Sequence, residues 1–282
     1  MDSQMGTGSA PVVIVGGGGK TGRRLAERLA AKGRSFRFAS RSTMPSFDWT
    51  DRSTWKDALG GAGSLYLSYQ PDLGLPGGAE AVDALSRLAS EMGIKRVVLL
   101  SGRGEQGAER AEQALMAAVP EWTILRCSWF NQNFSESFLT DGVMSGEIVL
   151  PAGDVAEPFV DADDIADVAA VVLTERGHER QLYELTGPRA LIFAEIADLF
   201  SHHLERPVRF TQVPLEPFLD ELRAQSLPDE IIALMRMLFD EVLDGRNSGI
   251  ADGVERVLGR PPRDFQSYIA GASAAGSWRP AA

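Results

Sequence analysis

A run of glycines near the N-terminus constrains the fold more than any other feature of the chain. The run, Gly16-Gly17-Gly18-Gly19-Lys20-Thr21-Gly22, follows the apolar residues 12–15 and leads into residues 21–32, where apolar side chains recur at helical spacing. It contains the G-x-G-x-x-G pattern. Glycines permit a tight turn from strand to helix and let backbone N–H groups approach a pyrophosphate at the helix N-terminus. We therefore expect residues 16–22 to bind the pyrophosphate of a dinucleotide.

The residues after the second expected strand indicate which dinucleotide binds. A site for NAD usually has Asp or Glu at this point, where the carboxylate binds the ribose 2′-hydroxyl. This chain has Ser40-Arg41-Ser42 instead. A guanidinium flanked by two hydroxyls suits a 2′-phosphate, so we expect NADP(H) to be preferred over NAD(H). The alternative is that Arg41 is a solvated surface charge.

Apolar runs and helical patterns alternate through the first half of the chain. Strands are expected at residues 12–15, 35–39, 65–68, 96–101 and 122–126, with helices at 21–32, 79–92 and 105–118. This alternation predicts an α/β fold with a Rossmann-type, doubly wound parallel sheet. Ligands of such sheets bind at the carboxyl ends of the strands.

The pattern changes in the second half, where residues 193–204, 215–224 and 228–243 read as amphipathic helices. They predict a smaller, mainly helical C-terminal lobe. We expect an NAD(P)-binding domain at residues 11–150, with strand and helix contributions from 155–190, and a substrate-covering lobe at 191–271. Residues 1–10 and 272–282 are expected to be flexible tails.

Charge and composition argue against several other partners. The 282 residues carry a net charge of −11 and few lysines, none after Lys95, which argues against nucleic acid. The sequence has no run of about 18 apolar residues, so we expect no membrane partner. The single cysteine, Cys127, excludes an intramolecular disulfide, is expected to be a buried thiol, and suits a reducing cytoplasm. The three histidines lack metal-ligand spacing, so we expect no metal.

The chain also lacks a common catalytic pair. No tyrosine is followed four residues later by a lysine, so the Tyr-x-x-x-Lys pair of classical short-chain dehydrogenases is absent. The candidate catalytic residues are Ser101 and Tyr69. Ser101 lies at the end of the fourth expected strand, and Tyr69 is the one tyrosine expected near enough to donate a proton. Trp129, Phe130 and Asn133 follow the fifth expected strand and are candidate substrate contacts, although the two aromatic residues equally fit lobe packing.

A dinucleotide cleft with few proton donors favours a particular chemistry. A ketone needs an acid to neutralise the developing alkoxide, whereas an iminium ion already carries the positive charge that attracts a hydride. The sequence therefore favours hydride transfer to an activated acceptor, or no reaction at all.

Several segments resemble the NmrA-like atypical short-chain dehydrogenases. They are the glycine run and residues 39–42, 129–134, 159–166, 184–188 and 258–262. Gly19-Lys20-Thr21, Ser40-Arg41-Ser42 and Phe47-Asp48-Trp49 look most like the festuclavine/agroclavine dehydrogenase group, which reduces iminium intermediates with NADPH. The chain departs from many relatives at Gly17-Gly18, where they have Ala-Thr, and at Gly107 and Ala108, where some carry His or Lys.

The resemblance implies further contacts with the cofactor. Asp48 and Trp49 would approach the adenine, and Ser68, Tyr69 and Pro71 would flank the dinucleotide. We add Ser101 to this set because it ends the neighbouring expected strand.

Three possible functions follow from these sequence features. The first is an NADPH-dependent reductase of a small metabolite, with an iminium, quinone or enone-like acceptor, in secondary metabolism. The second is a non-catalytic NADP(H) redox sensor of the NmrA type, which would bind a protein partner. A third, weaker possibility is a tailoring protein that couples aromatic polyketide monomers. The protein is expected to be a cytoplasmic monomer or homodimer.

Overall fold

The computed structural model of the protein describes residues 10–279, so the predicted tail at 1–10, except Ala10, and residues 280–282 lie outside the described residues. The chain divides into two compact units. The sheet unit comprises residues 10–101, Gly107–Leu125 and Ala166–Leu182. The aromatic unit comprises Gly102–Gln106, Arg126–Ile165 and residues 183–279.

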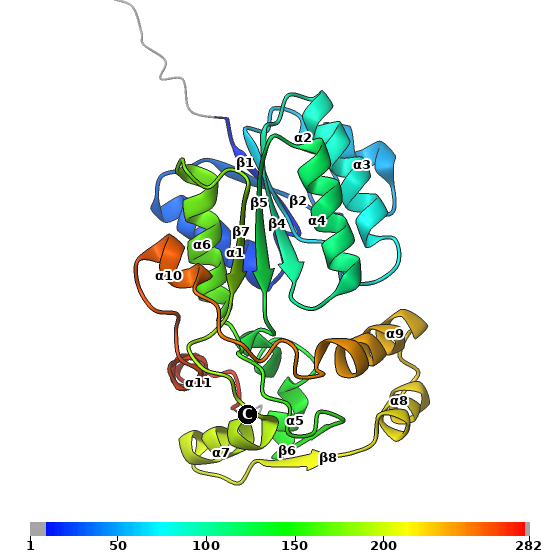
Figure 1. Ribbon diagram of the computed structural model, residues 1–282, viewed down its shortest axis with the longest axis vertical. Helices are drawn as coiled ribbons and strands as arrows, with labels where there is room; N and C mark the ends of the chain where they lie inside the picture. Colours follow the sequence, from blue (N-terminus) through cyan, green and yellow to red (C-terminus); the bar gives the residue numbers. More distant parts are fainter. Residues whose placement is uncertain (1–9, 280–282) are drawn as a thin grey trace, which may run out of the picture. The chain divides into compact units, whose positions relative to one another are not determined.

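A six-stranded sheet has the strand order β2-β1-β3-β4-β5-β7 (Figure 1). Its strands are β1 (Val12–Val15), β2 (Phe36–Ala39), β3 (Ser64–Leu67), β4 (Arg96–Gly102), β5 (Glu121–Cys127) and β7 (Gln181–Leu185). Strand β1 runs parallel to β2 and β3, and β3 runs parallel to β4. The order steps outward from β1 in both directions, so the predicted doubly wound α/β fold is confirmed.

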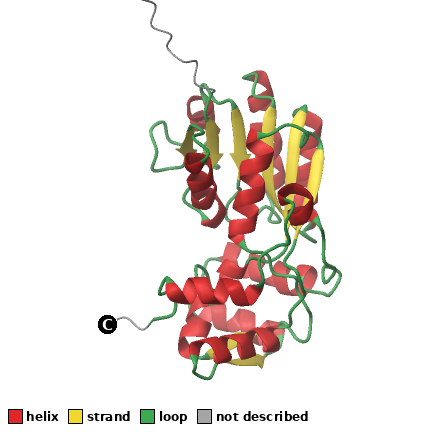
Figure 2. Ribbon diagram, turned by 90° about the vertical axis from the view of Figure 1, so that its left-hand side faces the viewer, coloured by secondary structure: helices red, strands yellow, loops and turns green. Residues whose placement is uncertain are grey.

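Helices cover both faces of this sheet, as the turned view in Figure 2 shows. Alternate strand residues such as Val13 and Val15 share one buried core with α2 (Trp55–Leu59), α3 (Gly78–Glu91) and α4 (Gln106–Ala118). On the opposite face, Arg28 of α1 (Lys20–Ala31) donates to Asp167 of α6 (Ala162–Thr174) at 2.9 Å. Both faces are covered, which explains why central strands such as β1 and β3 are buried along their whole length.

The predicted strands and helices of the sheet unit lie within one residue of the observed ends. Two elements were not predicted from the sequence. They are the short turn of 3₁₀ helix η1 (Arg52–Thr54) and α2. Both follow an Asx turn in which the Asp51 carboxylate accepts the N–H of Ser53. Such a turn leaves no hydrophobic periodicity by which to predict the short helix.

The aromatic unit contains more strand than we predicted. Its helices are α5 (Thr140–Ser145), α7 (Phe193–Leu204), α8 (Leu215–Ala224), α9 (Asp229–Met237), α10 (Gly253–Leu258) and α11 (Phe265–Ala274), together with the 3₁₀ turn η2 (Asn131–Phe134). Two short strands, β6 (Glu147–Leu150) and β8 (Arg209–Gln212), pair in parallel. The helix predicted at 228–243 ends at Met237 and continues as a π turn, Leu238–Val242.

Aromatic rings fill the core of this unit. Phe134 packs on Phe159, Phe193, Phe200 and Phe265 with ring centroids 5.5–6.2 Å apart. Trp278 closes this core, because it is 5% exposed, packs on Phe200, and donates its indole N–H to the carbonyl of Phe134 at 2.8 Å. The described residues from 272 to 279 therefore belong to the unit, contrary to the flexible tail that the sequence suggested.

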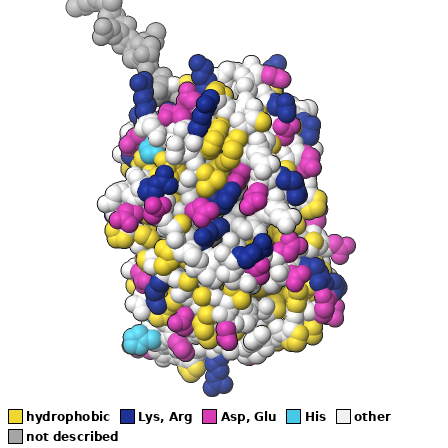
Figure 3. All heavy atoms as spheres, viewed as in Figure 1, with side chains coloured by type: hydrophobic (Ala, Val, Ile, Leu, Met, Phe, Trp, Pro, Cys, Tyr) yellow, Lys and Arg dark blue, Asp and Glu magenta, His cyan; other side chains and the backbone are white. Residues whose placement is uncertain are grey.

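No helix within residues 10–279 has the length and apolar character needed to cross a membrane. On the face shown in Figure 3, basic and acidic side chains lie intermingled rather than gathered by sign.

A buried carboxylate in the aromatic unit makes stability depend on pH. Glu157 is 2% exposed, and burial raises its pKa to about 7. The backbone N–H of Trp129, the side chain of Ser128 and the charge of Arg103 act in the opposite direction and lower this pKa. In the unfolded chain the Glu157 carboxyl group has a pKa near 4.5, so as pH rises the unfolded chain releases this proton before the folded chain does. The folded state is therefore favoured at low pH, and this stability is lost as pH rises through about 7.

We predict that the free energy of unfolding falls by on the order of 3 kcal/mol between pH 4.5 and pH 8 through Glu157 alone. Glu157→Gln keeps an acceptor for the Trp129 N–H and should remove this part of the pH dependence, so the variant should be more stable than the parent at pH 8. Urea unfolding across this pH range measures the effect. Glu230→Gln, at an exposed position of α9, is the matched control. An unchanged slope in Glu157→Gln would contradict the assignment.

Candidate functional site

Strand register brings the predicted cofactor loops together at one edge of the sheet unit. Val15 pairs with Ala39 and with Leu67, so Gly16, Ser40 and Ser68 begin three loops at the same level. The N–H of Gly16 donates to Ala39 O, and that of Ser68 donates to Val15 O, both at 3.3 Å. The carboxyl ends of parallel strands are where such sheets bind ligands.

Within the glycine run, a Cβ at any of three positions would meet other atoms of the protein. Gly16 has φ +81°, and a Cβ there would lie 2.9 Å from the carbonyl oxygen of Ser68. A Cβ on Gly22 would lie 2.6 Å from Gly16 O, and one on Gly17 would overlap the ring of Phe38. Gly18, in contrast, has open space around it. The loop therefore presents bare backbone, closed by a bond of 3.0 Å from Gly19 N–H to Gly16 O.

The run leads directly into α1, whose first turn suits an anion. Gly19 provides no side-chain cap, and no acidic residue occupies the first turn. The positive end of the helix dipole is thus not compensated by a side chain of that turn. Thr21 contributes backbone only, because its hydroxyl is buried and accepts the phenol O–H of Tyr66 at 2.9 Å.

Ser40-Arg41-Ser42 forms a turn that Thr43 fixes. The Thr43 hydroxyl accepts the N–H of Ser40 at 3.0 Å and lies 2.9 Å from Ser40 O, to which it donates. The hydroxyl groups of Ser40 and Ser42 lie 3.1 Å apart. Arg41 is exposed, so its guanidinium can reach a ligand at this edge. The turn thus keeps the two hydroxyls together, with the exposed Arg41 between them in the sequence.

Asp48 lies close enough to Arg41 for their charges to interact. The backbone N–H and the hydroxyl of Thr50 donate to the Asp48 carboxylate at 2.9 and 2.8 Å, and together with the charge of Arg41 they hold its pKa below the usual range. Asp48 is therefore an anion at neutral pH, beside the cation expected to bind a 2′-phosphate.

Trp49 and Tyr69, predicted separately, lie in one ring cluster. Their centroids are 5.0 Å apart, and Trp49 also packs edge-on against Phe47 and Trp55 at 5.1 and 6.0 Å. The phenol oxygen of Tyr69 lies 3.9 Å from the point where a Cβ of Gly77 would stand. Pro71 follows through a cis peptide bond. Tyr69 is therefore a packing partner of Trp49, a relation that its position in the sequence did not reveal.

Ser101 has a partner that the sequence analysis missed. It is 3% exposed and its hydroxyl donates to Glu112 of α4 at 2.6 Å, where Glu112 is itself 1% exposed. The only signal in the sequence was an acidic residue on the apolar face of a predicted helix, four residues before Met116 and three before Leu115.

The predicted substrate contacts lie in the aromatic unit. Trp129 is 8% exposed and its ring packs on Phe159, Phe193 and Phe239, so the packing alternative describes its side chain. Phe130 and Asn133 are partly exposed.

Cys127 is buried, and burial raises its thiol pKa well above the ordinary value, which is the behaviour of an inert thiol.

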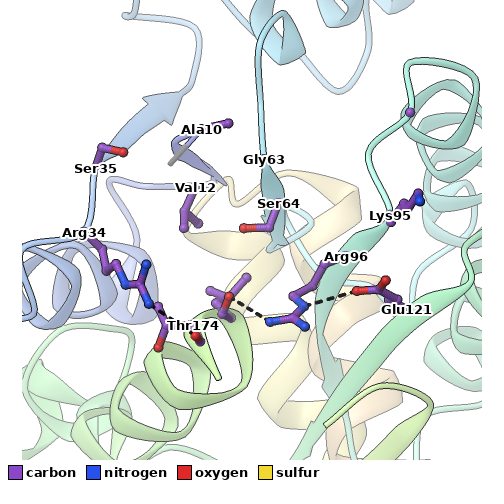
Figure 4. A pocket seen from close by; sticks show the side chains of 12 residues that line it. Ala10, Val12, Arg34, Ser35, Gly63, Ser64, Lys95, Arg96, Glu121 and Thr174 are labelled. Carbon is purple, nitrogen blue, oxygen red and sulfur yellow. Dashed lines mark hydrogen bonds and ion pairs between the residues drawn. The ribbon is translucent and has the colours of Figure 1, made fainter. Parts of the chain in front are cut away.

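A pocket of about 410 Å³ lies at the opposite, amino-terminal edge of the sheet (Figure 4). Its lining includes Arg34, Lys95 and Arg96. Arg96 is committed to Glu121 and Glu179 and to main-chain oxygens at the end of α6, and Arg34 also donates to an oxygen there. Arg34 and Arg96 thus tie strand beginnings to the end of a helix.

Comparison with known proteins places the chain in a family. Residues 112–265 match the model of the NmrA-like family. The chain is 31% identical to the uncharacterized oxidoreductase YesF of Bacillus subtilis, across 92% of this chain and 94% of that protein. The chain belongs to the NmrA-like family. Festuclavine synthase II of Penicillium roqueforti is also 31% identical, over 90% and 96% of the two chains, and the NAD(P)H azoreductase of Xenophilus azovorans is 27% identical, over 94% and 98%.

Solved structures share the fold. A triphenylmethane reductase of Citrobacter sp., complexed with NADP(H), superposes with a TM-score of 0.79 at 20% identity, over 93% of this chain and 99% of that chain. The NADPH-dependent quinone oxidoreductase QOR2 of Escherichia coli gives 0.76 at 20% identity over the same fractions. This NmrA-like chain therefore has the Rossmann-type fold of these reductases.

We predict that Gly22→Ala lowers the free energy of unfolding by about 1–3 kcal/mol, because the new Cβ meets backbone atoms of Gly16 and Gly17 that cannot move independently of β1. Gly18→Ala, in the same run but in open space, should stay within about 0.5 kcal/mol of the parent. Chemical denaturation of both variants measures the difference. Equal stability of the two variants would show that the close approach of Gly22 does not constrain the loop.

Proposed function

We propose that this NmrA-like protein is a reductase that takes its hydride from NADPH in preference to NADH and delivers it to a small, electron-poor acceptor. The observation that carries the proposal is the side-chain-free glycine run between β1 and the uncapped N-terminus of α1. This arrangement gives a pyrophosphate several backbone N–H donors and the positive end of a helix dipole.

The preference for NADPH is supported by the turn at residues 40–42. Arg41 with the hydroxyls of Ser40 and Ser42 offers charge-assisted bonds to a 2′-phosphate. Asp48 opposes this preference, since its anion competes for Arg41 and can accept a ribose hydroxyl. Trp49 and Tyr69 offer an aromatic surface beside this turn for the adenine.

The class of acceptor is supported by the scarcity of proton donors. Of the two candidate donors, Ser101 directs its proton to Glu112, so only Tyr69, whose ring packs on Trp49, is left as a candidate. Bound NADPH supplies the hydride, and the chain supplies orientation and exclusion of water. An acceptor that is already electrophilic, such as an iminium ion, a quinone or a conjugated enone, needs no further acid in the hydride step. The names of the related azoreductase, quinone oxidoreductase and triphenylmethane reductase fit this class. The similarity to the festuclavine synthases supports the proposal of a role in secondary metabolism.

The assay that tests this function follows the near-ultraviolet absorbance of NADPH in the presence of iminium, quinone and enone acceptors. We expect oxidation with at least one class, at a rate that saturates with acceptor. A chain that binds NADPH tightly and oxidises it with none of the three would contradict the reductase. That outcome, joined to a protein partner whose affinity differs between NADP⁺ and NADPH, would favour the redox sensor.

We predict that Arg41→Ala weakens NADPH binding by roughly tenfold and leaves NADH binding nearly unchanged, because only NADPH carries the 2′-phosphate. Calorimetric titration of each dinucleotide measures both affinities. Arg34→Ala removes the same charge at the opposite edge of the sheet and serves as the control. Equal losses for NADPH and NADH in Arg41→Ala would refute the 2′-phosphate assignment.

A further inference from the structure

A carboxylate is buried on the apolar face of α4. The inward positions of this helix include Ala108, Ala111, Glu112 and Leu115, which follow helical spacing, and Glu112 is the one ionisable residue among them. A carboxylate removed from water costs free energy unless it is hydrogen-bonded, and apolar replacement of such a group is often neutral or stabilising. The position therefore indicates a role other than packing.

The bond to Ser101 fixes the direction of one proton. The hydroxyl of Ser101 donates to Oε1 of Glu112 at 2.6 Å, which is a short hydrogen bond. With its proton directed toward Glu112, the oxygen of Ser101 keeps only lone pairs for other partners. Ser101 is then an acceptor, and it cannot simultaneously donate to a substrate or a cofactor.

The strand order determines which part of a dinucleotide lies near Ser101. The turn expected to bind the adenosine follows β2, and the glycine run expected to bind the pyrophosphate follows β1. The remaining half of the molecule must extend away from β2, across β3 toward β4. Ser101 lies at the carboxyl end of β4, where the nicotinamide ring would arrive. This step rests on the proposed function.

We propose that Glu112 is a positioning residue that holds the Ser101 hydroxyl as a hydrogen-bond acceptor for the carboxamide N–H of the nicotinamide. This contact sets the rotation of the ring and so the face from which hydride leaves. It also explains how a serine at the strand end coexists with the absence of the tyrosine–lysine pair, because this serine orients the cofactor and donates no proton to the acceptor.

The test compares two ligands that differ at the carboxamide alone. NADP⁺ carries –NH₂ on the ring carbonyl, whereas its 3-acetylpyridine analogue carries –CH₃ and has no N–H to donate. We expect the parent protein to prefer NADP⁺ by roughly two- to tenfold in calorimetric titrations, the span of one net hydrogen bond. In Ser101→Ala this preference should vanish because the acceptor is absent. In Glu112→Met it should vanish because the Ser101 hydroxyl is free to turn and to donate to the ring carbonyl group that each ligand carries.

A change in the ratio of affinities separates positioning from general structural damage, which would weaken both ligands alike. Ser101→Ala/Glu112→Met leaves no buried hydroxyl without a partner, and it should bind both ligands equally, as each single variant does. Glu112→Gln retains a neutral acceptor of the same size and should give an intermediate ratio, which keeps the test valid if Glu112→Met does not fold. Glu109→Gln, exposed on the same helix, should retain the parent ratio.

Each remaining outcome is decisive. A parent protein that binds both ligands equally, or a Glu112→Met variant that keeps the parent preference, overturns the positioning role and leaves the proposed function intact. A parent protein that binds neither ligand overturns the proposed function itself, together with this inference.

Discussion

The approach of Gly22 to the carbonyl oxygen of Gly16 is the constraint on which the candidate site depends. It lets the first turn of α1 begin directly above the end of β1, because no side chain separates helix from strand. The N–H groups of that turn therefore face the same edge of the sheet as the loops after β2 and β3. A methyl group at residue 22 would lift the helix away from this edge, and the cation at Arg41 would then stand beside a site without its central contact.

Local charges further determine which dinucleotide the proposed site would favour. The chain carries a net charge of −11, so attraction of a dinucleotide phosphate depends on local features rather than on the overall field. In the proposed function, backbone N–H groups and the helix dipole attract the pyrophosphate, and Arg41 is the residue proposed to distinguish the 2′-phosphate. The anionic Asp48 beside Arg41 should reduce that discrimination, so we expect the proposed preference for NADPH to be one of degree.

The sequence predicted the sheet unit well, because the patterns that mark its strands and its helices are both local. Buried strands such as Val12–Val15 and the helix stripe of α1 leave patterns that extend over only a few residues. The pairing of Ser101 with Glu112 could not be predicted in the same way, since it depends on how α4 lies on the sheet. Trp129 and Trp278 show the same limit, because the sequence marks them as aromatic without saying that other rings enclose them. The π turn after Met237 likewise interrupts a helix whose periodicity continues through it.

The central claim is that backbone N–H groups of the glycine run bind the dinucleotide, and amide chemical shifts test it most directly. On titration with NADPH, the nuclear magnetic resonance signals of the amides in residues 17–22 should move strongly and saturate together with those of residues 40–42. If NADPH binds while the amides of residues 17–22 keep their free shifts, or if no amide of the chain responds, the account of this protein as a dinucleotide-dependent reductase is contradicted.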